Sequence, residues 1–182
     1  MSHTVYAFVG QIVNLRPIGN RPTTEVVESC GLTIHGFQEL KALVGREAGV
    51  STWFAVTQDL ISQFASLTGD TQWIHVDPER ARAESPFGNA IAHGFLTLSL
   101  MSRLVREAVD LQDDFKIGVN YGFNRLRFPA PVPAGSRIRA RVTLNALKES
   151  SDHVEIAWGV TIEIENSARP ALVAEWLIRK YF

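Results

Sequence analysis

Residues 92–109 read AHGFLTLSLMSRLVREAV, and the predicted fold follows from this stretch. It is apolar on nearly every side as far as Met101 and becomes amphipathic only where Arg103, Arg106 and Glu107 appear. A helix without a polar face has to be buried by the elements around it. We therefore expect one long central helix that the rest of the chain encloses.

The chain downstream of this helix alternates between apolar and polar residues, which is the pattern of β-strands. A short strand is also expected upstream of the helix, where bulky residues cluster. The predicted strands cover residues 52–56, 117–123, 138–144, 154–164 and 171–181. Together these elements predict an α+β fold. In this fold, an antiparallel sheet of about five strands wraps around the long central helix. The last strand completes a meander, in which strands that follow each other in the chain pair with each other.

A short helix is predicted over residues 37–44, where Gly45 would end it, and two more follow before the central helix. Thr57 is a typical N-cap for the first of these two, and Gly69 ends it. Asp77 is followed by proline, and this pair is a typical start for a second short helix over residues 78–83. The polar residues between these two helices are therefore expected to lie in a loop.

Asp70 and His75 lie in that loop and form a candidate acid–base site. A carboxylate and an imidazole that share one water can pass protons in both directions near neutral pH. Gly94 is expected in the first turn of the central helix, where backbone N–H groups lack internal partners and favour negative charge. The alternative for Asp70 is a solvated turn residue without a catalytic role. The alternative for Gly94 is a glycine that only permits tight packing where the helix begins.

The composition excludes several classes of protein. The chain has 182 residues, 46% of them apolar and 20% charged, which is ordinary for one globular domain. A formal net charge of −1 gives no reason to expect nucleic acid or an anionic membrane as partner. The single Cys30, the lack of a membrane-length apolar stretch and the lack of a signal-peptide pattern predict a cytoplasmic protein. We expect an irregular N-terminal extension over residues 1–36 and one domain over residues 37–182.

The run from Phe64 to His75, followed by Asp77-Pro78, a loop and Ala92-His93-Gly94, resembles the signature of the MaoC-like, or R-specific, enoyl-CoA hydratases. Within that group it is similar to the nodulation-protein-N-like branch. The resemblance implies a hot-dog fold for residues 37–182 and a homodimer in which two sheets join edge to edge. It also implies hydration of trans-2-enoyl thioesters of coenzyme A, or of acyl carrier protein, to (3R)-3-hydroxyacyl thioesters, or the reverse dehydration.

The resemblance also implies roles for individual residues. Asp70 and His75 match the catalytic pair, in which one group activates water and the other protonates C2, while Gly94 donates its backbone N–H to the thioester oxyanion. Ser102 matches a helix serine that supports the catalytic aspartate, although a hydrogen bond within its own helix is an equal alternative. His93 is expected to be a supporting, structural histidine beside the site.

The chain departs from the family pattern at Gln72 and Trp73, which replace a common Asn-Pro pair. Glutamine keeps an amide that could orient a water but places it one methylene further out. The bulkier tryptophan is expected either to reshape the acyl pocket or to fill core. The implied reaction needs no cofactor and no metal.

Other interpretations remain open from the sequence. His75, Asp77 and the distal His153 match the crude order of a two-histidine, one-carboxylate iron site. A hot-dog scaffold also suits a thioester hydrolase, or a non-catalytic acyl-binding or heterodimer subunit. Three arginines on one strand face could meet CoA phosphates or pair with glutamates across the sheet. These are Arg137, Arg139 and Arg141.

Overall fold

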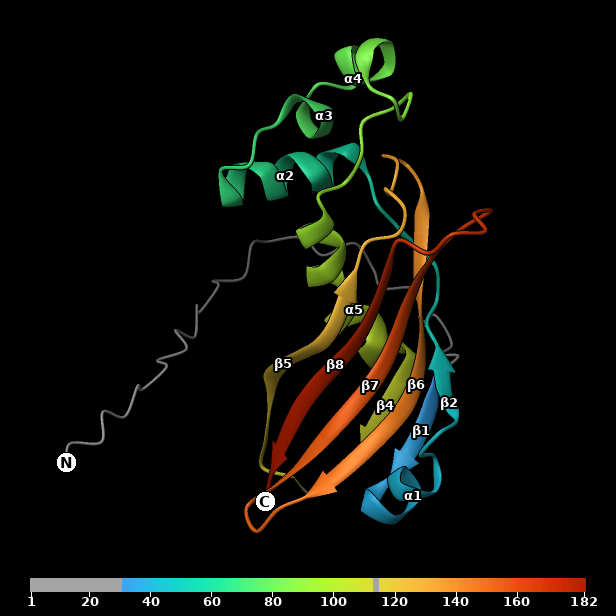
Figure 1. Ribbon diagram of the computed structural model, residues 1–182, viewed down its shortest axis with the longest axis vertical. Helices are drawn as coiled ribbons and strands as arrows, with labels where there is room; N and C mark the ends of the chain where they lie inside the picture. Colours follow the sequence, from blue (N-terminus) through green and yellow to red (C-terminus); the bar gives the residue numbers. More distant parts are fainter. Residues whose placement is uncertain (1–30, 113–114) are drawn as a thin grey trace, which may run out of the picture.

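The computed structural model describes residues 31–112 and 115–182 of the chain. The helices are α1 (Gly36–Ala42), α2 (Gln58–Thr68), α3 (Trp73–Val76), α4 (Pro78–Glu84) and α5 (Gly94–Ala108), and Figure 1 labels them along the chain. The strands are β1 (Leu32–His35), β2 (Glu47–Val50), β3 (Phe54–Ala55), β4 (Val109–Gln112), β5 (Ile117–Arg127), β6 (Arg137–Glu149), β7 (His153–Ile164) and β8 (Leu172–Tyr181).

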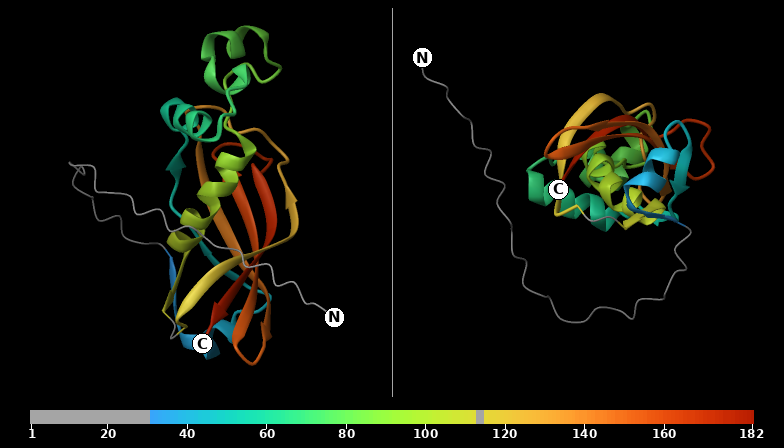
Figure 2. Two further views of the ribbon diagram at one scale, coloured as in Figure 1. Left: turned by 90° about the vertical axis from the view of Figure 1, so that its left-hand side faces the viewer. Right: turned by 90° about the horizontal axis from the view of Figure 1, so that it is seen from below.

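A curved sheet of six strands wraps around α5. The strand order is β2-β6-β7-β8-β5, β3 also pairs with β6, and all of these pairs are antiparallel. Seen from below, the sheet arcs over α5 (Figure 2). Strands β1 and β4 form a separate parallel pair. The predicted α+β architecture, an antiparallel sheet around a long central helix, is confirmed.

The predicted meander is correct for β6, β7 and β8 only, because β5 pairs with β8 and not with β6. Alternation along a strand identifies its two faces but not its neighbours. β5 is consequently the last strand on the path and is exposed along most of its length. Four of its large apolar side chains are exposed too, namely Ile117, Val119, Tyr121 and Phe123.

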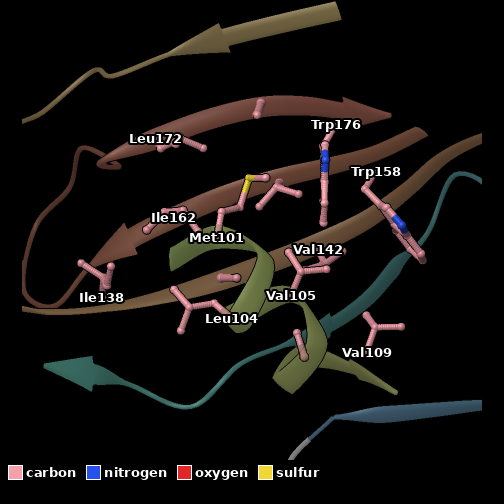
Figure 3. Close-up of a cluster of buried hydrophobic side chains, with 14 of the residues drawn as sticks. Met101, Leu104, Val105, Val109, Ile138, Val142, Trp158, Ile162, Leu172 and Trp176 are labelled. Carbon is pink, nitrogen blue, oxygen red and sulfur yellow. The ribbon is translucent and has the colours of Figure 1, made fainter. Parts of the chain in front are cut away.

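The core lies between α5 and the concave face of the sheet. Every second residue of β7 is buried, as expected for a strand with one face on a core. Met101 and Leu104 of α5 pack against this layer, which includes Ile162 of β7 and Trp176 of β8 (Figure 3). Each large apolar side chain buried in this way stabilises the fold by about 1.5–3 kcal/mol. This packing holds α5, and hence its N-terminal end, against the sheet.

Strand β2, which was not predicted, crosses the C-terminal end of α5 at close range. A Cβ built on Gly49 would lie 2.1 Å from the carbonyl oxygen of Ala108. Only glycine leaves room for this approach. A strand with glycine near its centre gives a weak apolar alternation, which explains the missed prediction. The strand expected over residues 52–56 is reduced to β3.

Strand β1 falls within the predicted irregular extension of residues 1–36. Residues 1–30, including Cys30, lie outside the described residues. For Leu32–His35 the prediction was wrong, because Ile34 is buried and this strand pairs with β4. Four residues are too few to show a period, so only the tertiary pairing identifies the strand. The single domain over residues 37–182 stays a prediction.

Helices α2, α3 and α4 lie together at one end of the molecule, beyond the N-terminal end of α5 (Figures 1 and 2). α2 and α4 start as predicted, since Thr57 accepts the N–H of Leu60 and Asp77 accepts the N–H of Arg80. His75 was expected in a loop but lies in α3, whose four residues are too few for a helical pattern. None of the described helices is long and apolar enough to cross a membrane.

Candidate active site

Asp70 lies on the turn that leaves α2. Gly69 ends the helix with φ 76°, in the left-handed region that favours glycine. The carboxylate of Asp70 accepts a hydrogen bond from the N–H of Gln72 at 3.5 Å. Its side chain is 55% exposed. The turn therefore presents a solvated carboxylate next to α3.

His75 is buried in α3, and the main chain fixes its ring. Its Nδ1–H donates to the carbonyl oxygen of Ile91 at 2.6 Å, and the N–H of Ile91 donates to the carbonyl oxygen of Ile74 at 3.0 Å. Gln58 donates its Nε2–H to the carbonyl oxygen of His75 at 2.7 Å. With Nδ1 protonated, Nε2 is the acceptor nitrogen of the neutral ring. That nitrogen is the one available for chemistry.

His93 is the N-cap residue of α5 and is buried between the two predicted catalytic residues. Its Nε2–H donates to the backbone carbonyl oxygen of Asp70 at 2.9 Å, and Nε2 lies 4.0 Å from Oδ2 of the same residue. Its ring stacks on that of His75, with the ring centres 3.8 Å apart and the planes 28° from parallel. Its Nδ1 is buried and has no hydrogen-bond partner among the described residues.

The structure brings Asp70, His75 and His93 together. One nitrogen or carboxylate oxygen from each residue lies within 4.8 Å of those of the other two. A single water can span that distance with two hydrogen bonds of ordinary length, about 2.8 Å each. Asp70 and His75, which the sequence predicted to share one water, are thus close enough to do so.

Burial lowers the pKa of His75 below its ordinary value, because a charged imidazole loses solvation there. The hydrogen bond to the carbonyl of Ile91 raises this pKa, a positive charge on His93 lowers it, and the carboxylate of Asp70 raises it. The net direction is downward. The ring of His75 is therefore neutral at neutral pH and can exchange a proton with a bound water.

Gly94 is the first residue of α5, so its N–H has no acceptor within the helix. The residue is exposed, and a Cβ added to it would lie 3.5 Å from the ring of Phe128. That ring packs edge-on against Phe95, with centres 6.5 Å apart. The first N–H of the helix therefore stands at an accessible place bordered by two aromatic rings.

Ser102 lies two turns further along α5, about 12 Å from Gly94 by helix geometry. Its hydroxyl donates to the carbonyl oxygen of Ser99 at 3.4 Å, which is the own-helix alternative left open by the sequence. Support of Asp70 by this serine stays a prediction. Ser102 instead lines a pocket of about 510 Å³ between α5 and strands β4, β5, β7 and β8. The apolar part of its lining includes Val105, Val119, Ile156, Trp158 and Trp176.

Gln72 and Trp73 have contacts other than those expected. The side chain of Gln72 is exposed, and its described contacts are made by its backbone, whose carbonyl accepts the N–H of His75 at 2.9 Å. The guanidinium of Arg80 lies 4.4 Å from the ring centre of Trp73. Trp73 therefore ties α3 to α4. The roles of these residues in orienting water or shaping the acyl pocket stay predictions.

The iron site considered from the sequence is not formed. Asp77 caps α4, and His153, the first residue of β7, bonds to the carboxylate of Asp152 at 2.7 Å. Within residues 31–112 and 115–182, the one group of ligand-type side chains close enough to share an ion is Asp70, His75 and His93. Carboxylate and imidazole would suit a divalent cation. A metal-free reaction stays a prediction.

The three arginines on β6 are paired rather than free. Charge pairing across the sheet was one of the two alternatives from the sequence, and the structure shows it. The pairs are Arg137 with Glu165, Arg139 with Glu163 at 2.6 Å, and Arg141 with Glu47 at 2.7 Å.

Sequence reasoning missed two groups that hold His75. Gln58 stands in the first turn of α2, where nothing in the pattern marks it as a partner of His75. Ile91 acts through its carbonyl oxygen, which leaves no side-chain signal. Only the fold brings these groups next to α3.

Comparisons with known proteins show the family of the chain. Residues 39–165 match the family described as MaoC like domain. The chain is 46% identical to 3-hydroxyacyl-thioester dehydratase Z of Mycobacterium tuberculosis over 148 residues, which cover 81% of this chain and 97% of that protein. It is also 46% identical over 140 residues to Nodulation protein N of Rhizobium meliloti, with 76% and 87% covered.

A solved structure shares the fold as well. The (R)-hydratase from Aeromonas caviae has a TM-score of 0.58 and 26% identity to this chain, and the match covers 74% of this chain and 94% of that one. These findings confirm the expected hot-dog fold. The chain belongs to the family of MaoC-like dehydratase domains.

Proposed function

We propose that this protein catalyses the (R)-specific addition of water to trans-2-enoyl thioesters, giving (3R)-3-hydroxyacyl thioesters, and the reverse dehydration. The observation that carries the proposal is the convergence of Asp70 and His75, within 4.8 Å of each other, beside the start of α5. The names of two similar proteins, 3-hydroxyacyl-thioester dehydratase Z and (R)-hydratase, support this reaction. Coenzyme A and acyl carrier protein are the alternative carriers of the acyl group.

Hydration of a conjugated double bond requires three events at one place. A water loses a proton as its oxygen attacks C3, C2 gains a proton, and negative charge builds on the thioester oxygen. Asp70 and His75 would share the first two events across one bound water. The N–H of Gly94 would donate to the thioester oxygen, and one such donor is typically worth about 10²- to 10³-fold in rate.

The pocket lined by Ser102 and Val105 supports a place for the acyl chain. Its volume of about 510 Å³ is in the range of small-molecule sites, about 300–1,000 Å³. Phe95 and Ser102 are seven residues apart on α5 and share one helix face. We place the acyl group along this face, from Gly94 towards Trp176.

A second copy of the chain is the proposed partner. Among the described residues β5 pairs on one side only, and an unpaired edge strand favours addition of another strand. Ile117 and Tyr121 on this strand are 57% and 53% exposed. A two-fold dimer would pair the β5 strands of two copies and cover these side chains. The exposed Phe95 and Phe128 extend this apolar face to Gly94, so the partner would border the active site.

The test of the reaction uses crotonyl-CoA. We expect loss of enoyl absorbance and a (3R) product on chiral analysis. Asp70→Asn keeps the shape of the side chain and removes its charge, and it should lower turnover by at least about 10²-fold. Asp59→Asn is a matched control, because Asp59 is exposed on α2 and bonds to Gln63. Near wild-type turnover in Asp70→Asn would refute the proposal.

The same assay separates the rival functions. A thioester hydrolase would release free CoA with no earlier loss of enoyl absorbance, and an acyl-binding subunit would bind the thioester without turnover. A chelator should leave the rate unchanged, because the proposed steps use no metal. A cytoplasmic location is part of the proposal and is tested by cell fractionation.

A further inference from the structure

His93 contacts both proposed catalytic residues, and it does so with two different parts of its ring. Its Nε2–H donates to the carbonyl oxygen of Asp70 at 2.9 Å. Its face stacks on His75 with the ring centres 3.8 Å apart. The ring of Phe64 lies against it too, with centres 5.1 Å apart. Packing thus holds the imidazole of His93 at the junction of the two groups.

We propose that His93 is a positioning residue for both catalytic groups: its Nε2–H fixes the main chain of Asp70, and its stacked ring disfavours a positive charge on His75. The inference rests on the proposed function, in which Asp70 and His75 carry the proton transfers. It gives His93 a task that a histidine filling core would not have.

The hydrogen bond acts on the position of the carboxylate. Asp70 follows the last turn of α2, and its exposed side chain is otherwise held by the N–H of Gln72 at 3.5 Å. Anchoring its carbonyl oxygen to the start of α5 fixes the point from which the carboxylate projects. The same contact fixes the distance between Asp70 and Gly94, which follows His93 directly. Misplacement of reacting groups by about 1 Å can cost about 10²-fold in rate.

The stack acts on the charge of His75. When one of two imidazole rings at this separation is positively charged, a positive charge on the other ring is disfavoured. The titratable groups that face His75 are His93, at the start of α5, and Asp70, on the turn after α2. The other contacts to His75 come from Gln58 and the carbonyl of Ile91, which do not titrate. His93 is therefore the neighbouring side chain that favours the neutral form of His75.

The first test is nuclear magnetic resonance of the ring nitrogens in the ¹⁵N-labelled full chain, with His75→Gln used to assign the His75 signals. The wild-type protein should show His75 protonated at Nδ1 and His93 protonated at Nε2. Observation of His93 protonated at Nδ1 and not at Nε2 would overturn the proposal. This measurement needs neither a His93 variant nor turnover.

Two variants then test the hydrogen bond, because both remove the imidazole and only one keeps a donor. His93→Gln keeps an amide donor near the position of Nε2. His93→Phe keeps a stacked ring but removes the donor. His93→Phe should lower kcat by about tenfold, the value of one lost hydrogen bond, with KM little changed, and His93→Gln should recover most of that loss. His153→Gln, at the start of β7, is the control.

Both variants should raise the pKa of His75, and the limb of the pH–rate profile that His75 governs should move to higher pH. A merely structural role for His93 would lower thermal stability without moving that limb. An unchanged His75 titration in His93→Gln would overturn the inference even if hydration were normal. If the titration moves but the wild-type protein does not hydrate crotonyl-CoA, the proposed function fails and the positioning of His75 stands.

Discussion

The rings of His75 and His93 lie 3.8 Å apart, centre to centre, with their planes 28° from parallel. Each ring donates one N–H to a backbone carbonyl, His75 to Ile91 and His93 to Asp70. The pair therefore joins three segments that are distant in sequence: the turn after α2, helix α3 and the start of α5. Its burial also makes the site sensitive to pH.

Stability should decrease on mild acidification because the pKa of His75 is lowered in the folded protein. Between that lowered pKa and the ordinary value of about 6.5, the unfolded chain binds more protons than the folded chain. The contribution of neutral His75 to the free energy of unfolding is therefore fully present above about pH 6.5, and it is lost as the pH falls from there towards the lowered pKa. The melting temperature should fall between about pH 7.5 and about pH 5.5, and His75→Gln should reduce this slope.

This pH range stays above the ordinary carboxylate pKa of about 4.3, so acidic residues contribute little to the slope. His153→Gln is the matched control, since His153 stands at the start of β7 and bonds to Asp152 rather than to His75. It should keep the wild-type slope. Equal slopes for His75→Gln and wild-type protein would contradict the burial argument.

Gly94→Ala should block access of the substrate to the N–H at the start of α5 without destabilising the fold. The added Cβ would lie 3.5 Å from the ring of Phe128, an ordinary contact, and alanine is the better helix former by up to about 1 kcal/mol. The free energy of unfolding should therefore be unchanged or higher. The methyl group would nevertheless stand where the thioester oxygen has to approach, so kcat/KM for crotonyl-CoA should fall at least about tenfold.

Urea unfolding and steady-state kinetics on one preparation check both parts of this prediction. A variant with wild-type kcat/KM would remove Gly94 from the proposed site. A variant that loses stability and activity together would show only a packing role for the glycine.

Ser102 offers a test of where the acyl chain lies. Its hydroxyl bonds to Ser99 of the same helix, so Ser102→Ala should change turnover of crotonyl-CoA by less than about threefold. Ser102→Leu would fill part of the pocket of about 510 Å³. It should lower kcat/KM for long enoyl chains much more than for crotonyl-CoA, as a panel of chain lengths would show. Strong loss in Ser102→Ala would instead support the predicted contact with Asp70.

The sequence predicted which helices and strands form better than it predicted which of them lie side by side. The apolar residues 92–101 were sufficient to predict a central helix that packs against the sheet. Burial on every side was not correct, because Phe95 and Ser99 are exposed. The place of β5 at the sheet edge and the pairing of β1 with β4 depend on contacts between distant segments, which periodicity does not record.

The candidate site shows the same division. Spacing and family resemblance led to Asp70 and His75, and the structure places the two within 4.8 Å of each other. The stack of His93 on His75 could not be read from the sequence, because it depends on the start of α5 packing beside α3. The bond from Gln58 to the His75 carbonyl has the same cause.

The proposed dimer predicts that charge on β5 will affect both mass and turnover. Ile117 and Tyr121 are more than half exposed on β5, which among the described residues has a neighbouring strand on one side only. Ile117→Lys together with Tyr121→Lys would place two like charges opposite those of the second copy. Wild-type protein at micromolar concentration should have the mass of a dimer in light scattering, and the double variant that of a monomer. Turnover of crotonyl-CoA should fall in the variant, because the partner would border Gly94.

Val173→Lys is the control for added charge, since Val173 is an exposed apolar residue on β8, which lies between β7 and β5 inside the sheet. It should keep the dimer mass and the wild-type rate. A wild-type monomer with full activity would contradict the edge-to-edge assembly while leaving the chemistry of Asp70 and His75 intact. Protein purified from its own cells could instead have the mass of a complex with a different subunit. That result would favour the heterodimer alternative, because another chain would then cover the apolar side chains of β5.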